Sequence, residues 1–403
     1  MPTSHRFNRL VFFFGIVLPP FLAMSIDSAH AQTSAAAPVA PPAAESAPPS
    51  LAPVTVQGVS YGPNAVSLPS TINILGQREL TEGQPRVNLS ESLEQVPGLI
   101  VNNRQDYAQD MQMSIRGFGA DSAFGVQGIY MTLDDIPLTM PDGQGQTQAI
   151  DLPMIGGMQV IKGPFAALYG NAAGGVIHAY TRDAPDPPSL SLSSWTGNWG
   201  THQTTLIGGG TIGNVSGIAG FTDFHTDGWR QHSGATRQQF NGTLTWNATP
   251  DDRYSLVLNV VNQDAFDPGG LTRTELEQNP RQVEASRIAF NARKTVSNDQ
   301  TGLVWEHRFD ADNTLRTTVY GGTRGVTQYL PFTGGTGASA GGVIDLSDYF
   351  GGTTVDYTHR GLLASRPYTA TAGLSYAREN EFRHGFVNNQ GVEGVLRNDQ
   401  YNT

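Results

Sequence analysis

Three short segments carry residue spacings that are associated with chemistry in other proteins. Residues 208–213 match the GxGxxG pattern of phosphate-binding loops, residues 58–62 match the GxSxG pattern of hydrolase nucleophiles, and residues 142–146 alternate polar side chains as calcium loops do. None has the required context, because no helix pattern follows the first, prolines flank the second, and Pro153 stands where the third needs a bidentate Glu. No acid–base pair or triad is recognisable either. The sequence therefore predicts no catalytic residue, no metal site, no cofactor and no enzyme.

Composition narrows the class of protein further. The 403 residues include 47 Gly, 25 Pro and no Cys, and they carry a formal net charge of −11. The lack of Cys excludes disulfides and cysteine zinc sites, and the acidic balance argues against nucleic acid as a partner. Charged residues make up only 15% of the chain and hydrophobic residues 38%. Such a mixture of Gly and small polar residues favours many short strands over a helical bundle.

Residues 1–31 are predicted to be a secretory signal peptide. Arg6 and Arg9 precede the apolar run Leu10–Leu18, and the small residues Ala29 and Ala31 precede a cleavage point before Gln32. A membrane anchor is the weaker interpretation, because two prolines end the run well short of the ~18 residues that a spanning helix needs. No later stretch reaches that length, so a role in a membrane would require spanning strands.

Two segments of unusual composition follow the predicted cleavage point. Residues 32–53 are almost entirely Ala, Pro and Ser, and are predicted to form a disordered linker because they contain too few large apolar side chains to fold. Residues 54–58 are β-prone, and a strand on a flexible linker can pair with the sheet edge of a partner protein. An ordinary first strand explains the same residues equally well.

Residues 59–188 are predicted to form a mixed α/β domain. Leu89, Leu93 and Val96 recur at the spacing of one helical face, and Pro97 ends that helix, which we place over residues 88–96. Short strands are expected at residues 113–117, 129–133 and 158–163.

Residues 189–403 show the alternation of antiparallel strands. Phe240, Leu244 and Trp246 fall on one face of a strand, whereas Asn241 and Thr245 fall on the other. The apolar face would be the core of a β-sandwich or the lipid-facing surface of an outer-membrane barrel. The alternation alone does not separate these two folds.

The connections between the predicted strands favour the barrel. About nine strands are expected, at residues 189–198, 201–212, 215–226, 236–248, 252–263, 298–309, 314–328, 350–361 and 367–380. Tight turns on one side alternate with long connections at residues 227–235, 264–297 and 329–349 on the other. Short turns on one rim and long loops on the opposite rim are typical of outer-membrane barrels.

The order of several motifs resembles the TonB-dependent outer-membrane receptors, of the siderophore receptor type. The matching segments are Val54–Val56, Leu93–Leu99, Ser114–Gly119, Leu133–Leu138, Val160–Gly170 and Gly174–Ile177. The resemblance implies a plug domain, residues 59–188, seated inside a transmembrane β-barrel of 22 strands whose N-terminal part is residues 189–403. It also implies a location in the bacterial outer membrane, a monomer in contact with outer-membrane lipid, and energy-coupled uptake of a ferric siderophore or similar iron chelate.

The same resemblance assigns roles to individual residues. Val54, Thr55, Val56 and Gln57 look like the TonB box, the segment that binds TonB of the inner-membrane energy-transducing complex. Candidate ligand contacts lie in the apical loops of the plug, at Arg104, Gln105, Asp142, Gln144 and Gln146, whose charged and amide groups suit an oxygen-rich chelate. Ordinary solvated loop tips are the alternative for each of them. Arg116 and Lys162 are expected to form structural ion pairs that hold the plug.

The length of the chain is short for this family. About nine strands are too few for the expected barrel, so the sequence is expected to be C-terminally truncated. Two alternatives to a transporter remain. One is a secreted soluble β-rich carbohydrate-binding protein or enzyme, which would need an apolar interior. The other is a non-transporting receptor fragment.

Overall fold

The computed structural model describes residues 71–103, 106–122, 125–163, 169–170, 172–335 and 341–403. The chain divides into two units, residues 1–53 and 54–403, and all described residues belong to the second. The predicted signal peptide, the linker and residues 54–58 lie outside the described part. Among the residues that the structure describes, no helix is long and apolar enough to cross a membrane.

The first body is built on a five-stranded sheet with the strand order β1-β6-β7-β4-β5. Strands β4 and β7 pair in parallel, and the other neighbours pair antiparallel. The elements are β1 (Thr71–Gly76), α1 (Gln77–Thr81), α2 (Ser90–Leu93), β2 (Leu99–Asn102), β3 (Gln112–Ile115), β4 (Ile129–Leu133), β5 (Ile136–Pro137), η2 (Thr147–Ala149), η3 (Leu152–Met154), β6 (Ile155–Lys162) and β7 (Gly175–Thr181). Strands β2 and β3 form a separate two-stranded sheet.

The predicted helix over residues 88–96 is shorter than expected, because only α2 is helical. The backbone N–H groups of Val87 and Asn88 donate to the carboxylate of Glu91 at 3.0 Å, which holds the preceding residues in a turn. Gly98 adopts a φ of 78°, and the chain turns there into β2. The predicted apolar face is nevertheless correct, since all three of its side chains are buried.

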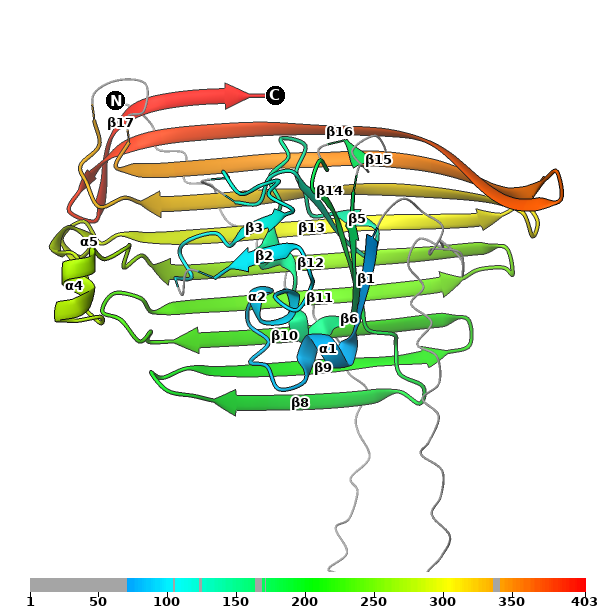
Figure 1. The fold of residues 1–403 in the computed structure, drawn as a ribbon, viewed down its shortest axis with the longest axis horizontal. Helices are drawn as coiled ribbons and strands as arrows, with labels where there is room; N and C mark the ends of the chain where they lie inside the picture. The colour runs from blue at the N-terminus through cyan, green and yellow to red at the C-terminus, as the bar shows by residue number, and fades with distance from the viewer. Residues whose placement is uncertain (1–70, 104–105, 123–124, 164–168, 171, 336–340) are drawn as a thin grey trace, which may run out of the picture. The chain divides into compact units, whose positions relative to one another are not determined.

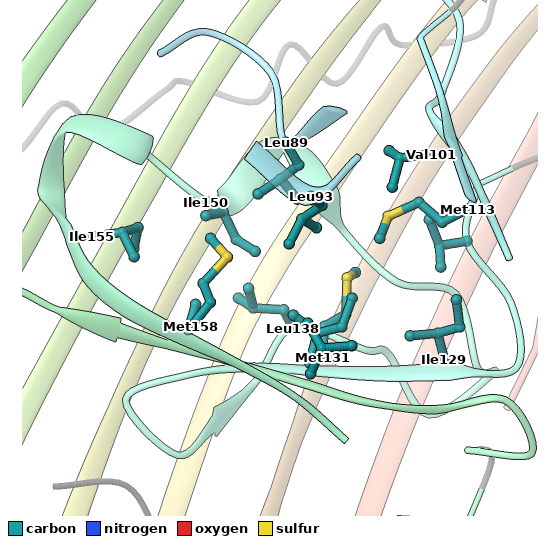
Figure 2. Close-up of a cluster of buried hydrophobic side chains, with 14 of the residues drawn as sticks. Leu89, Leu93, Val101, Met113, Ile129, Met131, Leu138, Ile150, Ile155 and Met158 are labelled. Atoms are coloured by element: carbon teal, nitrogen blue, oxygen red, sulfur yellow. The ribbon is translucent and has the colours of Figure 1, made fainter. Parts of the chain in front are cut away.

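This body has an apolar core of its own, drawn in Figure 2. Leu93 from α2, Met131 from β4 and Met158 from β6 are fully enclosed, and Val261 from the second body joins the same cluster. Each such side chain contributes about 1.5–3 kcal/mol of burial free energy. The core explains why the segment folds as a compact unit despite its many loops.

The second body is one antiparallel sheet of ten strands in sequence order (Figure 1). Its strands are β8 (Ser189–Thr196), β9 (His202–Ile212), β10 (Val215–Thr226), β11 (Ala235–Asn247), β12 (Asp252–Phe266), β13 (Arg293–Arg308), β14 (Asn313–Tyr329), β15 (Val343–Leu363), β16 (Arg366–Asn389) and β17 (Val392–Asn402). The prediction of about nine strands is therefore one short. Strand β17 was missed because its sequence is mostly polar, but the turn before it is a typical hairpin turn, with positive φ at Gln390 and Gly391.

Connections alternate in length between the two rims of the sheet. One rim carries the tight links 213–214, 248–251, 309–312 and 364–365. The other rim carries residues 197–201, 227–234, 267–292 and 330–342, together with the final turn before β17. The longest connection contains α4 (Arg273–Gln278) and α5 (Ala285–Ala289), which lie at one end of the strands in Figure 1.

The two faces of the sheet have opposite polarity, and the apolar face points outward. Leu244 is 49% exposed on that face, whereas its neighbour Asn241 on the other face is only 3% exposed, because it lies against the first body. Near the tight-turn rim the outward face carries a row of aromatic rings, with Trp246, Tyr254 and Trp305 stacked on adjacent strands. A β-sandwich would bury its apolar face, so this arrangement decides in favour of a membrane-facing wall.

Candidate functional site

Side-chain amides on the inward face of the sheet form the main contacts with the first body. They donate to backbone carbonyl oxygens, in the pairs Gln239 to Gln148 at 2.9 Å, Asn259 to Ala149 at 2.6 Å, Gln263 to Tyr107 at 2.7 Å and Gln300 to Pro137 at 2.6 Å. Each neutral hydrogen bond contributes about 1 kcal/mol net. The first body is therefore held by many weak bonds that can be broken one at a time.

Sequence reasoning did not identify this set of amides. The alternation along the strands placed Asn241 on the polar face, and the same rule applied to each strand would have placed the others there. The local pattern does not show how far along its strand a residue lies relative to the inner body. Only the pairing register shows which polar positions lie beside that body.

The turn Asp134–Asp135 is a second anchor between the two bodies. Both residues adopt positive φ, 49° and 67°, as a tight turn between paired strands requires. Asp134 accepts hydrogen bonds from the backbone and side chain of Thr181 and from Thr243 of the sheet, and burial raises the pKa of its carboxyl group. Asp135 pairs with Arg316 at 3.2 Å. The Leu133–Leu138 motif thus has a structural role in holding the inner body to the wall.

A third anchor is the fully enclosed carboxyl group of Asp151. Its Oδ2 accepts hydrogen bonds from Thr222 at 3.0 Å and from Asn241 at 3.5 Å, and both donors belong to the sheet. Burial raises the pKa of Asp151 to about 6 even though these hydrogen bonds oppose the shift. Among the described residues, no positively charged side chain lies within 4.0 Å of the Asp151 carboxyl group. Asp151 therefore contacts the wall through hydrogen bonds alone.

Residues 106–111, in the loop between β2 and β3, are bonded to the wall near the rim that carries the long connections. Asp110 binds Lys294 at 2.9 Å through both carboxylate oxygens and accepts a further hydrogen bond from Gln148 at 2.8 Å. Burial alone would raise the pKa of Asp110, but the charge and hydrogen bonds of Lys294 outweigh it and lower that pKa. The ring of Tyr107 packs against Phe224 with centroids 5.2 Å apart.

The loop of residues 141–148 contains three of the predicted ligand contacts. The side chain of Gln144 accepts a hydrogen bond from Arg324 at 3.3 Å, and Gln146 is buried. Asp142 is exposed, and its backbone N–H donates to Glu379 of β16 at 3.1 Å. The structure therefore brings these residues to the inner wall, with Asp142 exposed, Gln144 partly buried and Gln146 buried.

The remaining predicted residues differ in what the structure describes. Arg104 and Gln105, and the segment Val54–Gln57, lie outside the described residues. Lys162 is buried, and its ammonium donates a hydrogen bond to the carbonyl oxygen of Pro97. Among the described side chains no carboxylate lies within 4.0 Å of Lys162, so its partner differs from the carboxylate that was expected. An ion pair of Arg116 stays a prediction.

The long loops at the rim are tied to one another. Arg230 donates to the carbonyl oxygens of Gly269 at 2.6 Å and Gln282 at 2.9 Å. The guanidinium of Arg281 lies 4.3 Å from the ring centroid of Trp199. These bonds join three of the four long connections on this rim into one ordered cluster.

The space between the β2–β3 loop and the wall is small. A cavity of about 30 Å³ is bordered by Tyr107 and Gln109 of the loop and by Arg237 and Gln263 of the wall. That volume holds only one or two water molecules. No group of three or more metal-ligating side chains occurs in the part of the chain that the structure describes. The arrangement is thus a close polar seal with an apical loop cluster above it.

Comparison with protein families gives this arrangement a context. Residues 64–176 match the family model of the TonB-dependent Receptor Plug Domain. Among characterised proteins, the chain is 23% identical over 228 residues to the hemin receptor of Yersinia enterocolitica, which covers 52% of the chain and 30% of that protein. It is 24% identical over 213 residues to the ferric enterobactin receptor of Pseudomonas aeruginosa, covering 49% of the chain and 24% of that protein.

Solved structures show the same fold. The unliganded ferric citrate transporter FecA matches with a TM-score of 0.68 and 18% identity, over 82% of this chain and 51% of that one. The ferric yersiniabactin uptake receptor FyuA of Yersinia pestis matches with a TM-score of 0.63 and 15% identity, over 79% and 49%. The chain thus spans about half the length of these receptors.

Sequence and fold lead to the same assignment. The plug-domain match covers the first body, and the ten antiparallel strands correspond to part of the receptor barrel. The inner body is therefore a plug, and the sheet is the wall beside it. The chain carries the plug domain of TonB-dependent receptors at residues 64–176, beside ten strands with the fold of part of the receptor barrel.

Proposed function

We propose that this receptor carries out energy-coupled uptake of a ferric siderophore or similar iron chelate. The observation that carries the proposal is the plug itself, which is sealed against the wall by weak neutral hydrogen bonds to its backbone. A plug held in this way closes the lumen, yet it can be displaced when force is applied. The names of its relatives support the ligand class, since they include a ferric enterobactin receptor and hemin receptors.

The coupling segment in this proposal is Val54–Gln57. These residues would pair as a strand with TonB, because a β-prone segment next to an Ala/Pro-rich linker can reach a partner's sheet edge. The outward apolar face would contact outer-membrane lipid, and the receptor would act as a monomer.

The ligand would bind at the apical loops. Asp142, Arg104 and Gln105 are the residues proposed to contact it, with Gln144 and Gln146 behind them. Because Gln144 already accepts a hydrogen bond from Arg324, a chelate that competes for Arg324 would release this loop from the wall. Ligand binding and loosening of the plug would then be linked through one guanidinium.

The test is a deletion of residues 54–57, compared with a deletion of residues 40–43, which removes four linker residues and leaves the segment intact. Cells are given a radiolabelled ferric catecholate, ferric citrate or hemin, and both surface binding and uptake are measured. We expect the first deletion to abolish uptake with binding unchanged, and the second to leave both unchanged. Uptake that persists without residues 54–57 would refute energy coupling through this segment, and loss of binding would refute its separation from the ligand site.

Hemin is the competing ligand, favoured by the similarity to hemin receptors of two Yersinia species. The same assay separates the two, because uptake of only one of the labelled compounds would identify the ligand class.

A further inference from the structure

Two histidines lie directly opposite each other on the outward face of the wall. His202 is the first residue of β9, His225 lies next to the end of the neighbouring strand β10, and the antiparallel register pairs the two. The centroids of their imidazole rings are 5.0 Å apart. Two imidazoles that bind one tetrahedral metal ion, at metal–nitrogen distances of about 2.0–2.1 Å, have ring centroids about 5 Å apart. The spacing of the two rings therefore suits a shared metal ion.

Each of the two rings is held by an oxygen atom beside it. Nε2 of His225 lies 3.2 Å from a carboxylate oxygen of Asp227, and Nδ1 of His202 lies 3.0 Å from the carbonyl oxygen of Gly200. Because such oxygens only accept hydrogen bonds, each neutral ring carries its N–H at that nitrogen. Among the described residues, no hydrogen-bond partner occurs at the other nitrogen of either ring. Metal-binding histidines are oriented in this way, since they donate their second N–H to a carboxylate or a backbone carbonyl.

The turn of residues 197–201 supports both of these oxygens. Gly200 adopts a φ of 64° and supplies the carbonyl oxygen for His202. A side chain at Gly200 would collide with the carboxylate of Asp227, so the glycine leaves the space in which that carboxylate lies. The backbone N–H of Asp227 donates to the carbonyl oxygen of Trp199 at 2.9 Å. One short turn thus positions the oxygen atoms that orient the two imidazoles.

The two rings border an open cavity on the outward face. Its volume is about 360 Å³, which leaves room for an ion with several bound water molecules. Asp223 and Asp264 also border the cavity. Two carboxylates beside a pair of imidazoles give the cavity a negative charge that favours a cation.

The site lies nearer the long-connection rim than the apolar band of the wall. Leu206 and Phe221, which pair with each other further along β9 and β10, are 43% and 42% exposed on the same outward face. The inward side chain Phe224, next to His225, packs instead against Tyr107 of the plug. The histidines therefore lie where the outward face changes from apolar to polar, and on the opposite face of the wall from the plug.

We propose that His202 and His225 bind one divalent transition-metal ion of the class that prefers imidazole, such as Zn²⁺, Cu²⁺ or Ni²⁺. No third metal-ligating side chain joins them in the described part of the chain, so water would complete the coordination. The site goes beyond the proposed uptake, because an ion bound there does not lie between plug and wall. It also differs from the sequence-based expectation of no metal site, since the register of β9 and β10 brings together two residues that share no local motif.

Cu²⁺ is the probe, because it binds nitrogen ligands most tightly among these ions and is paramagnetic. One equivalent is added to the full chain, purified in detergent micelles without a His tag, and electron spin echo envelope modulation counts the imidazoles bound to the ion. We expect two imidazoles in the unmodified chain, one in His202→Gln or His225→Gln, and none in the double variant. An excess of Zn²⁺ should displace the Cu²⁺, because both ions use the same ligands.

Two further variants separate this site from adventitious binding. His307 also lies on the outward face and 2.8 Å from the carboxylate of Asp252, but its cross-strand partners are Asp252 and Leu315, so His307→Gln should keep both bound imidazoles. Asp227→Ala removes an orienting oxygen and should lower the affinity for Cu²⁺ about 10–100-fold. Circular dichroism checks the fold of each variant. Fewer than two imidazoles on Cu²⁺ in the unmodified chain, or an affinity that neither His202→Gln nor His225→Gln lowers, would overturn the proposal.

Discussion

The plug and the wall bury opposite kinds of side chain, and each arrangement follows from what surrounds it. The plug encloses Leu93 and Met131 in an apolar core, as a soluble domain does. The wall points Leu244 and Leu374 outward and keeps amides such as Asn259 inside. The plug therefore supplies the apolar packing and the wall supplies the polar contacts. This difference shows how a folded domain can keep an apolar core and still be held to a membrane-facing wall by polar contacts.

A large effect is expected where the two bodies share a buried ion pair. Lys294→Met leaves Asp110, whose side chain is 19% exposed, without its cation, which should cost up to about 3 kcal/mol at neutral pH. Hydrogen exchange of plug amides would show the loss. The loss should be smaller in acid, because without Lys294 burial raises the pKa of Asp110 and the group takes up a proton. Exchange that is unchanged at neutral pH would contradict the anchor.

Truncating a side chain in the plug core tests whether the plug depends on apolar packing. Leu93→Ala should destabilise the plug by about 2–5 kcal/mol, because the enclosed side chain leaves a cavity. Leu374→Ala is the matched control, since that side chain is 83% exposed on the outward face. Tryptophan fluorescence should stay unchanged in both, because every Trp lies at or after Trp195, outside the plug. Equal exchange rates of plug amides in the two variants would break the comparison.

A substitution on the outward face of the wall tests whether that face contacts lipid. Leu244→Arg places a charge among lipid-facing side chains and should reduce the amount of receptor assembled in the membrane, at a cost of about 2–4 kcal/mol if the residue lies near the bilayer centre. Gln278→Arg, in the outer loop, should leave assembly unchanged. Quantifying receptor in washed outer membranes measures both. Equal levels would mean that Leu244 does not face lipid.

The smallest effect should come from a single amide. Gln239→Ala removes the hydrogen bond to the carbonyl oxygen of Gln148 and should weaken plug seating by only about 1 kcal/mol. Gln300→Ala should do the same at the carbonyl oxygen of Pro137, and the two effects should add in hydrogen exchange of the plug amides. A loss of several kcal/mol from either single variant would show that the seal is not shared among many weak bonds.

Local sequence patterns predicted which face of a helix is buried and which side of a strand is polar. The apolar spacing of Leu89, Leu93 and Val96 identified a buried face, and the alternation in β11 placed Asn241 on the polar side. The polar strand β17 has no such pattern, and only its turn at Gln390–Gly391 signals it. The ion pair of Asp110 and Lys294 lies beyond any local pattern, because its residues are far apart in the chain and are brought together by the seating of the plug.

A reversible cross-link between plug and wall tests whether uptake requires the plug to move away from the wall. In the Cys-free chain, Asp151→Cys and Thr222→Cys place two thiols where the side-chain oxygens of a plug residue and a wall residue are 3.0 Å apart. Oxidation is expected to stop uptake of the labelled iron chelate without reducing surface binding, and a reductant is expected to restore uptake. Full uptake by the oxidised, demonstrably cross-linked receptor would contradict that requirement.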